Sequence, residues 1–187
     1  MKALARSYVY WPNIDEDLEN TALSCQGCIS VRNMPSPAPL HQWEWPSQPW
    51  RRIHIDFAGP LNNRMLLVIV DAHSKWPEVI PMRQATTSST IEALRSVWAR
   101  FGVPDQVVSD NGTQFTSAEF QQFMKNNGVR HIKSAPYHPA TNGLAERFVQ
   151  SVKRALKSAN TNESTLSKEL SKFLIAYRNA PHCTTGA

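Results

Sequence analysis

Residues 109–115 read Ser-Asp-Asn-Gly-Thr-Gln-Phe, and residues 136–147 read Pro-Tyr-His-Pro-Ala-Thr-Asn-Gly-Leu-Ala-Glu-Arg. The first stretch begins at the end of a short run, 106–109, that is predicted to be a strand, and the Asn-Gly pair after Asp110 suits a tight turn. We therefore expect the Asp110 carboxylate at the C-terminal end of a strand, where open α/β sheets bind their ligands. The second stretch delivers Glu146 to the beginning of a strongly patterned helix.

This helix is expected to have one polar and one apolar face. At a rotation of about 100° per residue, four polar side chains fall within about 60° of one another, namely Glu146, Gln150, Lys153 and Lys157. The opposite face carries Phe148, Val152 and Ala155. The acid is thus expected at the head of a basic, solvent-facing stripe.

A third carboxylate comes from an earlier strand. Residues 53–57 alternate in polarity, which predicts a half-buried strand with His54 and Asp56 on its polar face. Taken singly, each of the three acids has an ordinary structural explanation. An Asp before Asn-Gly forms turns, a Glu in a first helical turn complements the macrodipole, and an Asp on a half-polar strand is often simply exposed.

The pattern of the remaining elements predicts an α/β fold. The apolar run 65–70 is typical of a central strand that is covered on both faces. A helix is expected over 88–100, with Ser88 or Ser89 as its N-cap and Gly102 as its stop. Other elements are expected at 76–82 (strand), 117–127 (helix) and 129–133 (strand), with two helices after them. This order favours a mixed sheet flanked by helices.

The N-terminal part differs in composition from the rest. Residues 1–34 are polar, are predicted to be helical, and contain the pair Cys25 and Cys28. Residues 35–50 hold five prolines and three tryptophans, a composition that favours an extended linker. The main domain is therefore expected at 51–187.

The charge is unevenly distributed. The net charge is +5, and from Val129 onward nine basic residues face three acids, a composition that raises the expectation of a polyanionic partner such as nucleic acid. The longest apolar run, 65–70, is far shorter than the roughly 20 residues that a membrane helix requires. No secretory signal is recognisable at the start, and three cysteines cannot all pair. We therefore expect a soluble, intracellular protein.

The joint spacing of the motifs resembles one family. Thirty-five residues, 111–145, separate Asp110 from Glu146. This spacing and the sequences around both acids resemble the D,D-35-E signature of retroviral and retrotransposon integrases, in particular those of Gypsy-type LTR retrotransposons. The resemblance runs over essentially the whole chain, from Trp11-Pro12 to Tyr177-Arg178-Asn179.

This resemblance implies a ribonuclease H-like core with a five-stranded mixed sheet flanked by helices. It assigns Asp56, Asp110 and Glu146 as the catalytic residues and as the ligands of two Mg²⁺ or Mn²⁺ ions, and carboxylate oxygens are the ligands that such hard ions prefer. Asp71, which ends the second predicted strand, is expected to cap that strand rather than to bind metal. His54 is expected to support its neighbour Asp56 or to pack.

The resemblance also implies contacts with DNA. The residues assigned to these contacts are Tyr137, Asn142, Gln150, Lys153 and Lys157. Lys153 is expected to contact a phosphate, whereas Lys157 is equally compatible with a plain solvated face. Tyr137 lies in a predicted loop, 134–143, where an aromatic side chain can stack on DNA ends or can pack internally.

The chain departs from the family pattern at both ends. The N-terminal integrase module binds zinc through two histidines upstream of its cysteine pair, but the first histidine here, His41, follows Cys25 and Cys28. Structural zinc needs four protein ligands, so residues 1–34 are interpreted as a remnant of that module and no zinc is expected. The chain ends at Ala187, which leaves no room for a C-terminal DNA-binding module.

The expected function is that of a polynucleotidyl transferase that carries out metal-dependent 3′-end processing and strand transfer on double-stranded DNA, in the nucleus and as a homo-oligomer. Neither a membrane nor a small-molecule substrate is expected. One alternative is a catalytically silent, domesticated remnant that binds DNA or protein. Another is cleavage of RNA in a hybrid duplex, but that site normally carries an additional carboxylate.

Overall fold

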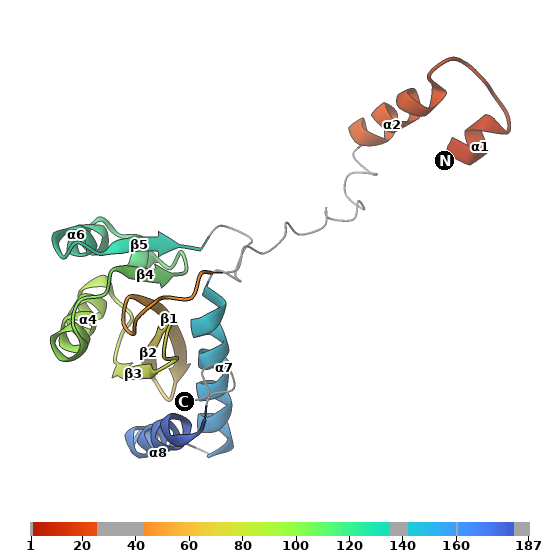
Figure 1. The fold of residues 1–187 in the computed structure, drawn as a ribbon. Coiled ribbons are helices and arrows are strands. Elements are labelled where there is room, and N and C mark those ends of the chain that lie inside the picture. Colours follow the sequence, from red (N-terminus) through yellow and green to blue (C-terminus); the bar gives the residue numbers. More distant parts are fainter. Residues whose placement is uncertain (1, 26–42, 135–141, 160, 182–187) are drawn as a thin grey trace. The chain divides into compact units, whose positions relative to one another are not determined.

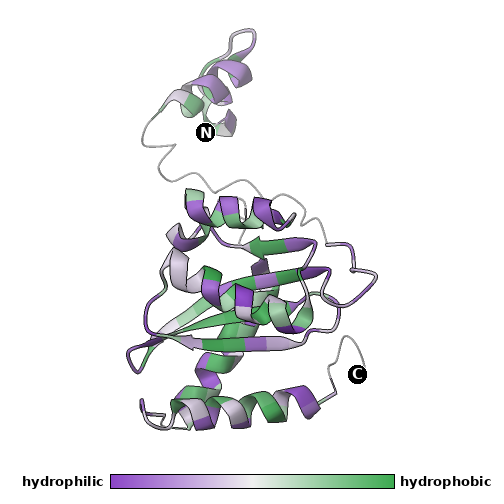
Figure 2. Ribbon diagram, turned by 90° about the vertical axis from the view of Figure 1, so that its left-hand side faces the viewer, coloured by the Kyte–Doolittle hydropathy of each residue, from purple (hydrophilic) through white to green (hydrophobic). Residues whose placement is uncertain are grey.

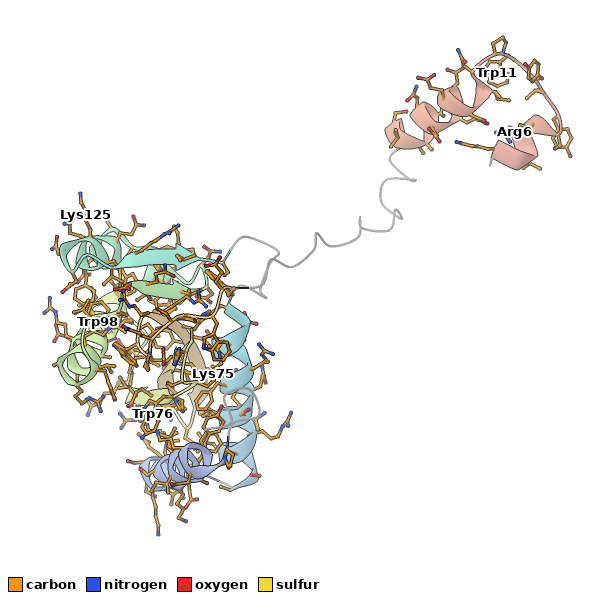
Figure 3. The ribbon with its side chains drawn as sticks, viewed as in Figure 1. Arg6, Trp11, Lys75, Trp76, Trp98 and Lys125 are labelled. Atoms are coloured by element: carbon orange, nitrogen blue, oxygen red, sulfur yellow. The ribbon has the colours of Figure 1, made fainter. Side chains whose placement is uncertain are left out.

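The computed structural model describes residues 2–25, 43–134, 142–159 and 161–181 and divides the chain into two compact units, residues 1–41 and 42–187. The described part of the first unit contains two helices, α1 (Lys2–Arg6) and α2 (Ile14–Ser24), within the predicted helical segment 1–34, of which residues 26–34 lie outside the described residues. Figure 3 shows Arg6 of α1 reaching toward α2, where its guanidinium pairs with the Asp15 carboxylate. Within the described residues of both units, no helix is both long and apolar enough to cross a membrane.

The second unit is built on a five-stranded mixed sheet in the order β3-β2-β1-β4-β5 (Figure 1). Its strands are β1 (Arg52–Leu61), β2 (Arg64–Asp71), β3 (Pro77–Met82), β4 (Gln106–Ser109) and β5 (Arg130–Lys133). β1, β2 and β3 pair antiparallel, whereas β4 runs parallel to both β1 and β5. The predicted mixed sheet flanked by helices is confirmed.

Helices cover both faces of this sheet, and the sheet alternates accordingly. The helices are α4 (Thr87–Phe101), α5 (Thr113–Thr116), α6 (Ala118–Asn126), α7 (Gly143–Ser158) and α8 (Leu166–Asn179). In β2, Leu67 and Ile69 pack with residues of α4 and α6, whereas Leu66 and Val68 pack with residues of α7 and α8. Figure 2 shows the strands in hydrophobic colours over much of their length, as expected of a buried central sheet.

The ends of the helices follow the predicted chemistry with small shifts. Gly102 ends α4 with a φ of 90°, a left-handed conformation that glycine adopts readily. The N-cap of α4 is Thr86, not Ser88 or Ser89, and Ser89 instead completes a capping box with Thr86. Asp71 is buried and accepts hydrogen bonds from the backbone N–H groups of Trp50, His73 and Ser74. Asp71 therefore caps the end of β2, as predicted.

The first strand is more deeply buried than its alternating sequence suggests. His54 lies on the predicted polar face, yet it is only 2% exposed, because α7 packs against β1 on that side. A polar residue at every second position therefore did not mark a solvent-facing surface. In this strand the polar face meets a helix that supplies polar partners.

Residues 43–50, the second half of the predicted linker, lie against the core; we call this segment the strap. The Arg52 guanidinium lies 4.5 Å from the centre of the Trp43 ring, and the Lys75 ammonium lies 3.9 Å from the centre of the Trp45 ring. The Trp50 indole donates to the carbonyl oxygen of Gly102 at 2.7 Å. The boundary between the two compact units accordingly falls between residues 41 and 42, within the segment predicted as a linker.

Candidate functional site

The sheet brings two of the predicted acids together. β1 and β4 are adjacent and parallel, and His54 pairs with Val108 in their register. Asp56 and Asp110 each follow this pair by two residues, so both lie at the same level of the sheet, Asp110 just beyond the end of β4. Asp110 thus lies at the carboxyl end of β4, where ligands bind in such sheets, and Asp56 lies beside it within β1.

Asp56 is half-buried, and its carboxylate is repelled by those of the other two acids. Burial is the main cause that raises its pKa to about 6, and repulsion from Asp110 and Glu146 raises it further, while Lys153 opposes this rise. The carboxylate accepts a hydrogen bond from the backbone N–H of Phe57 at 2.7 Å. These effects indicate that Asp56, Asp110, Glu146 and Lys153 share one electrostatic neighbourhood.

Asp110 is fixed by a turn and by the strand behind it. Its carboxylate accepts from the backbone N–H of Gly112 at 3.0 Å, which is the turn that the Asn-Gly pair predicts. The Ser109 hydroxyl donates to the carbonyl oxygen of Asp110 at 2.8 Å and lies 2.9 Å from Nε2 of His131. Because a hydroxyl has one hydrogen to donate, His131 donates from Nε2 to Ser109. The Asn111 side chain adds a bond to the carbonyl oxygen of Ser134.

Glu146 comes to the site from helix α7, whereas Asp56 and Asp110 come from the sheet. It lies in the first turn of α7, the fourth residue of that helix rather than its first. Burial and repulsion from Asp110 raise the pKa of its carboxyl group. The helix is anchored by its buried face, which includes Phe148 and Val152, so the polar face that carries Glu146 is directed away from the core.

The start of α7 is tied to β1 by a buried polar pair. The Asn142 side chain donates from Nδ2 to the carbonyl oxygen of Ile55 at 2.9 Å, and its Oδ1 lies 3.2 Å from Nδ1 of His54. Asn142 was predicted to contact DNA. Here both polar ends of its side chain are used internally, so a DNA contact would require these bonds to break. The sequence shows an Asn-Gly pair and gives no indication of a partner so far back along the chain.

The other predicted DNA contacts lie on α7 or outside the described residues. Gln150 and Lys157 are exposed, whereas Lys153 is half-buried next to the acids. Tyr137 lies outside the described residues, as does Cys28, whereas Cys25 follows the end of α2. The DNA contacts and the absence of zinc stay predictions.

The donor set fits a hard divalent cation in its chemistry. Burial and repulsion from neighbouring acids raise the pKa values of Asp56 and Glu146, a cost that a cation between the carboxylates would relieve, and oxygen-only ligation suits Mg²⁺ or Mn²⁺. Within residues 2–25, 43–134, 142–159 and 161–181, however, no three acidic, His or Cys side chains are arranged closely enough to hold a metal ion. The acids are near enough to repel one another but would need to converge to bind a metal together.

Comparison with known proteins identifies the fold that carries these acids. Residues 46–139, which include Asp56 and Asp110, match the family described as integrase core domain. The chain belongs to this family. The integrase core is 46% identical over 97% of its length to the protein K02A2.6 of Caenorhabditis elegans, which is described as uncharacterized. It is 34% identical, over 80% of its length, to the Pro-Pol polyprotein of simian foamy virus type 3.

The relatives are much longer than this integrase core. It spans 14% of each of these two proteins and 14% of the Tf2-3 transposon polyprotein of Schizosaccharomyces pombe, to which it is 28% identical over 94% of its length. The matched segment is thus about a seventh of each relative.

Solved structures confirm the ribonuclease H-like integrase core fold. A simian T-cell lymphotropic virus intasome in complex with PP2A regulatory subunit B56 gamma gives a TM-score of 0.70 at 24% identity, covering 97% of this chain and 66% of that one. The HTLV-2 integrase catalytic core domain in complex with magnesium gives a TM-score of 0.59 at 24% identity, covering 71% of this chain and 89% of that one.

Proposed function

We propose that this integrase core is a polynucleotidyl transferase that depends on Mg²⁺ or Mn²⁺ and acts on the ends of double-stranded DNA. The observation that carries the proposal is that Asp56 and Asp110 lie at one level of two neighbouring strands, where burial and the charges of Asp110 and Glu146 raise the pKa of Asp56. Membership of the integrase core domain family supports the same reaction class. The magnesium in the HTLV-2 integrase core supports the choice of ion.

The three carboxylates would hold the ions. Bound divalent cations would activate the attacking oxygen and stabilise the leaving oxygen in an in-line phosphoryl displacement. Asp56 and Asp110 enter from neighbouring strands and Glu146 enters from α7, so the acids can bind from different sides. A bound cation would offset the repulsion among the three carboxylates and would thereby favour their convergence.

No side chain of the protein needs to act as a nucleophile in this reaction. Water as the attacking group trims a DNA 3′ end, and a 3′ hydroxyl as the attacking group joins that end to a second DNA. Lys153 is half-buried and lowers the pKa of Asp56, and it would neutralise a phosphate of the bound DNA. The same set of residues therefore serves both processing and strand transfer.

Two further expectations follow from this function. Joining two DNA ends to a target requires two active sites, so we infer that the working form is a homo-oligomer bound to DNA. The DNA that receives the joined end would be chromosomal, so the reaction would take place in the nucleus.

The reaction can be tested with the full 187-residue chain on a branched DNA that reports the reversal of strand transfer, in buffer with Mn²⁺. We expect turnover that depends on the ion. Glu146→Gln should lower the rate by at least about 100-fold, because it removes a charge that the site needs in the transition state.

Glu119→Gln is the matched control for this experiment. Glu119 also lies in the first turn of a helix, α6, but it is exposed. This variant should keep the wild-type rate. A folded wild-type chain that binds the branched DNA without turnover, or a Glu146→Gln variant as active as Glu119→Gln, would contradict the proposed function.

A further inference from the structure

A buried polar bridge joins β1 to the beginning of α7, and none of the three acids takes part in it. His54 is 2% exposed and Asn142 is 0% exposed, and their side chains approach at 3.2 Å. Asn142 also donates to the carbonyl oxygen of Ile55 at 2.9 Å. That carbonyl can only accept, so it fixes the amide nitrogen of Asn142 on its side and leaves the amide oxygen toward His54. His54 therefore carries its hydrogen on Nδ1 and donates it to Asn142.

The bonding of Asn142 is unusual for its place in the helix. Asn142 is the N-cap residue of α7, a position where asparagine normally accepts a hydrogen bond from the first turn of its own helix. Here its side chain makes no such bond. The amide is instead committed to β1, across the gap between two layers of the fold. Its contribution is thus a tie between elements rather than a cap.

Both ends of this tie are close to the predicted acids. Its β1 end consists of His54 and the carbonyl oxygen of Ile55, immediately before Asp56. The α7 end is Asn142, four residues before Glu146 in the same helical segment. A shift at this tie therefore changes the separation of Asp56 and Glu146 directly.

The strap covers the β1 end of the tie. The edge of the Trp43 ring meets the His54 ring with their centres 6.0 Å apart and their planes at 86°. The Arg52 guanidinium lies over Trp43 and also donates to the carbonyl oxygen of Glu44 at 2.8 Å. These contacts exclude water from the His54–Asn142 pair, and hydrogen bonds that are shielded from water are costly to leave broken.

We propose that His54 and Asn142 are positioning residues that fix the first turn of α7, and with it Glu146, against the strand that carries Asp56. The catalytic consequence rests on the proposed function, whereas the structural tie does not. Catalytic groups must be held to within fractions of an ångström, and a misplacement of about 1 Å costs on the order of 100-fold in rate. The His54–Asn142 tie supplies this restraint between β1 and α7, which belong to different layers and are not joined as paired strands are.

Two substitutions of His54 separate the hydrogen bond from packing. His54→Asn places an amide N–H where the imidazole Nδ1–H lies, so it should keep the bond to Asn142. His54→Leu has similar bulk but leaves the Asn142 oxygen buried without a donor. Val97→Ala is the control for general destabilisation, because Val97 is buried in α4, within the core on the other side of the sheet.

The first measurement is hydrogen exchange of the metal-free chain. The amides of residues 146–149 donate to the carbonyls at the start of α7, so they report its opening. In His54→Leu we expect exchange at these amides to accelerate at least about tenfold relative to the amides of α4. His54→Asn should restore most of the protection. Val97→Ala should lower the melting temperature without this local effect.

The second measurement is the kinetics of the branched-DNA reaction. We expect His54→Leu to lower kcat by about 10- to 100-fold with little change in the KM for DNA, and His54→Asn to recover most of kcat. Unchanged exchange at residues 146–149 in His54→Leu, or equal behaviour of the Leu and Asn variants, would overturn the positioning role. Faster exchange in His54→Leu, together with a wild-type chain that shows no turnover, would support the tie and overturn the proposed function instead.

Discussion

At the level of single residues, Asp56 is placed where its charge is needed for chemistry and unfavourable for stability. The folded state raises its pKa from 3.8 to about 6, so the folded chain binds this proton more tightly than the unfolded chain does. Stability therefore falls as the pH rises from about 4 to about 6, and the cost is present in full above that range. A bound cation would remove this cost.

We accordingly predict that Asp56→Asn stabilises the metal-free protein while it abolishes activity. The gain in the free energy of unfolding at pH 8 should be on the order of 1–2 kcal/mol and should vanish near pH 4, where the wild-type carboxyl is already neutral. Urea unfolding at both pH values measures it. Asp105→Asn, which removes an exposed acid paired with Arg51, should give no gain. A loss of stability in Asp56→Asn at pH 8 would contradict the cost of burying this charge beside two other acids.

His131 gives a pH dependence of the opposite sign. Burial is the main cause that lowers its pKa to about 4 from 6.5, so the unfolded chain binds this proton more tightly. Its contribution to stability is present above about pH 6.5 and is lost as the pH falls toward 4. His131→Gln can still donate to Ser109 but does not titrate. Between pH 7 and pH 5 the free energy of unfolding, measured with urea, should fall by about 1 kcal/mol less in the variant than in wild type. Equal losses would show that His131 is not held neutral.

The sequence predicted the acids at residue scale better than it predicted their supports. Asp110 could be placed from the Asn-Gly turn that follows it, because turn chemistry is local. Asn142 could not be placed, because its partner His54 lies 88 residues away and an Asn-Gly pair looks the same whether the amide contacts DNA or a strand. A buried polar bridge leaves no periodic trace in the sequence.

At the level of elements, the strap shows how tertiary contacts override composition. Its prolines and tryptophans suggest an extended linker, and the chain there is indeed not helical. The rings nevertheless pack on the core, because Arg52, Lys75 and Phe101 supply partners for Trp43, Trp45 and Trp50. Those partners lie in β1, in α4 and in the loop between β2 and β3, so no local pattern could indicate them.

We predict a graded effect of substitutions in the strap. Trp50→Ala should destabilise the chain by about 2–4 kcal/mol, because it removes the bond to Gly102 and the contact with Phe101, whose ring centre is 4.8 Å away. Trp45→Ala should cost about 1 kcal/mol or less, since its ring is exposed and its contacts are a cation–π pair with Lys75 and an edge contact with the His73 ring. Thermal unfolding of both variants measures which one is less stable. A larger loss in Trp45→Ala than in Trp50→Ala would show that Trp45, rather than Trp50, holds the strap.

At the level of the whole molecule, the proposed binding of DNA would involve the basic C-terminal third and the polar face of α7. Each phosphate contact releases counterions, so its loss should reduce the slope of log K against log salt by about 1. Lys153→Gln is expected to show this change, because Lys153 lies next to the acids. Lys125→Gln, on α6, should leave the slope unchanged (Figure 3). Salt titrations of binding to a DNA duplex measure both slopes, and equal slopes for wild type and Lys153→Gln would remove Lys153 from the interface.

The five strands could be predicted from alternation and apolar runs, but their arrangement could not. The parallel pairing of β1 with β4 brings Asp56 and Asp110 to one level, although more than fifty residues separate them. Periodicity describes which face of a strand is buried and says nothing about which strand lies beside it. The convergence of the acids was expected only through the resemblance to integrases.

We infer that Asp56, Asp110 and Glu146 together bind divalent cations. A crystal structure of the chain grown with Mn²⁺, with anomalous difference maps, shows where these ions bind. We predict Mn²⁺ peaks coordinated by oxygens of all three carboxylates, with the first turn of α7 shifted toward β1 and β4. Maps in which Mn²⁺ binds elsewhere, or in which these carboxylates stay apart at saturating Mn²⁺, would contradict the account.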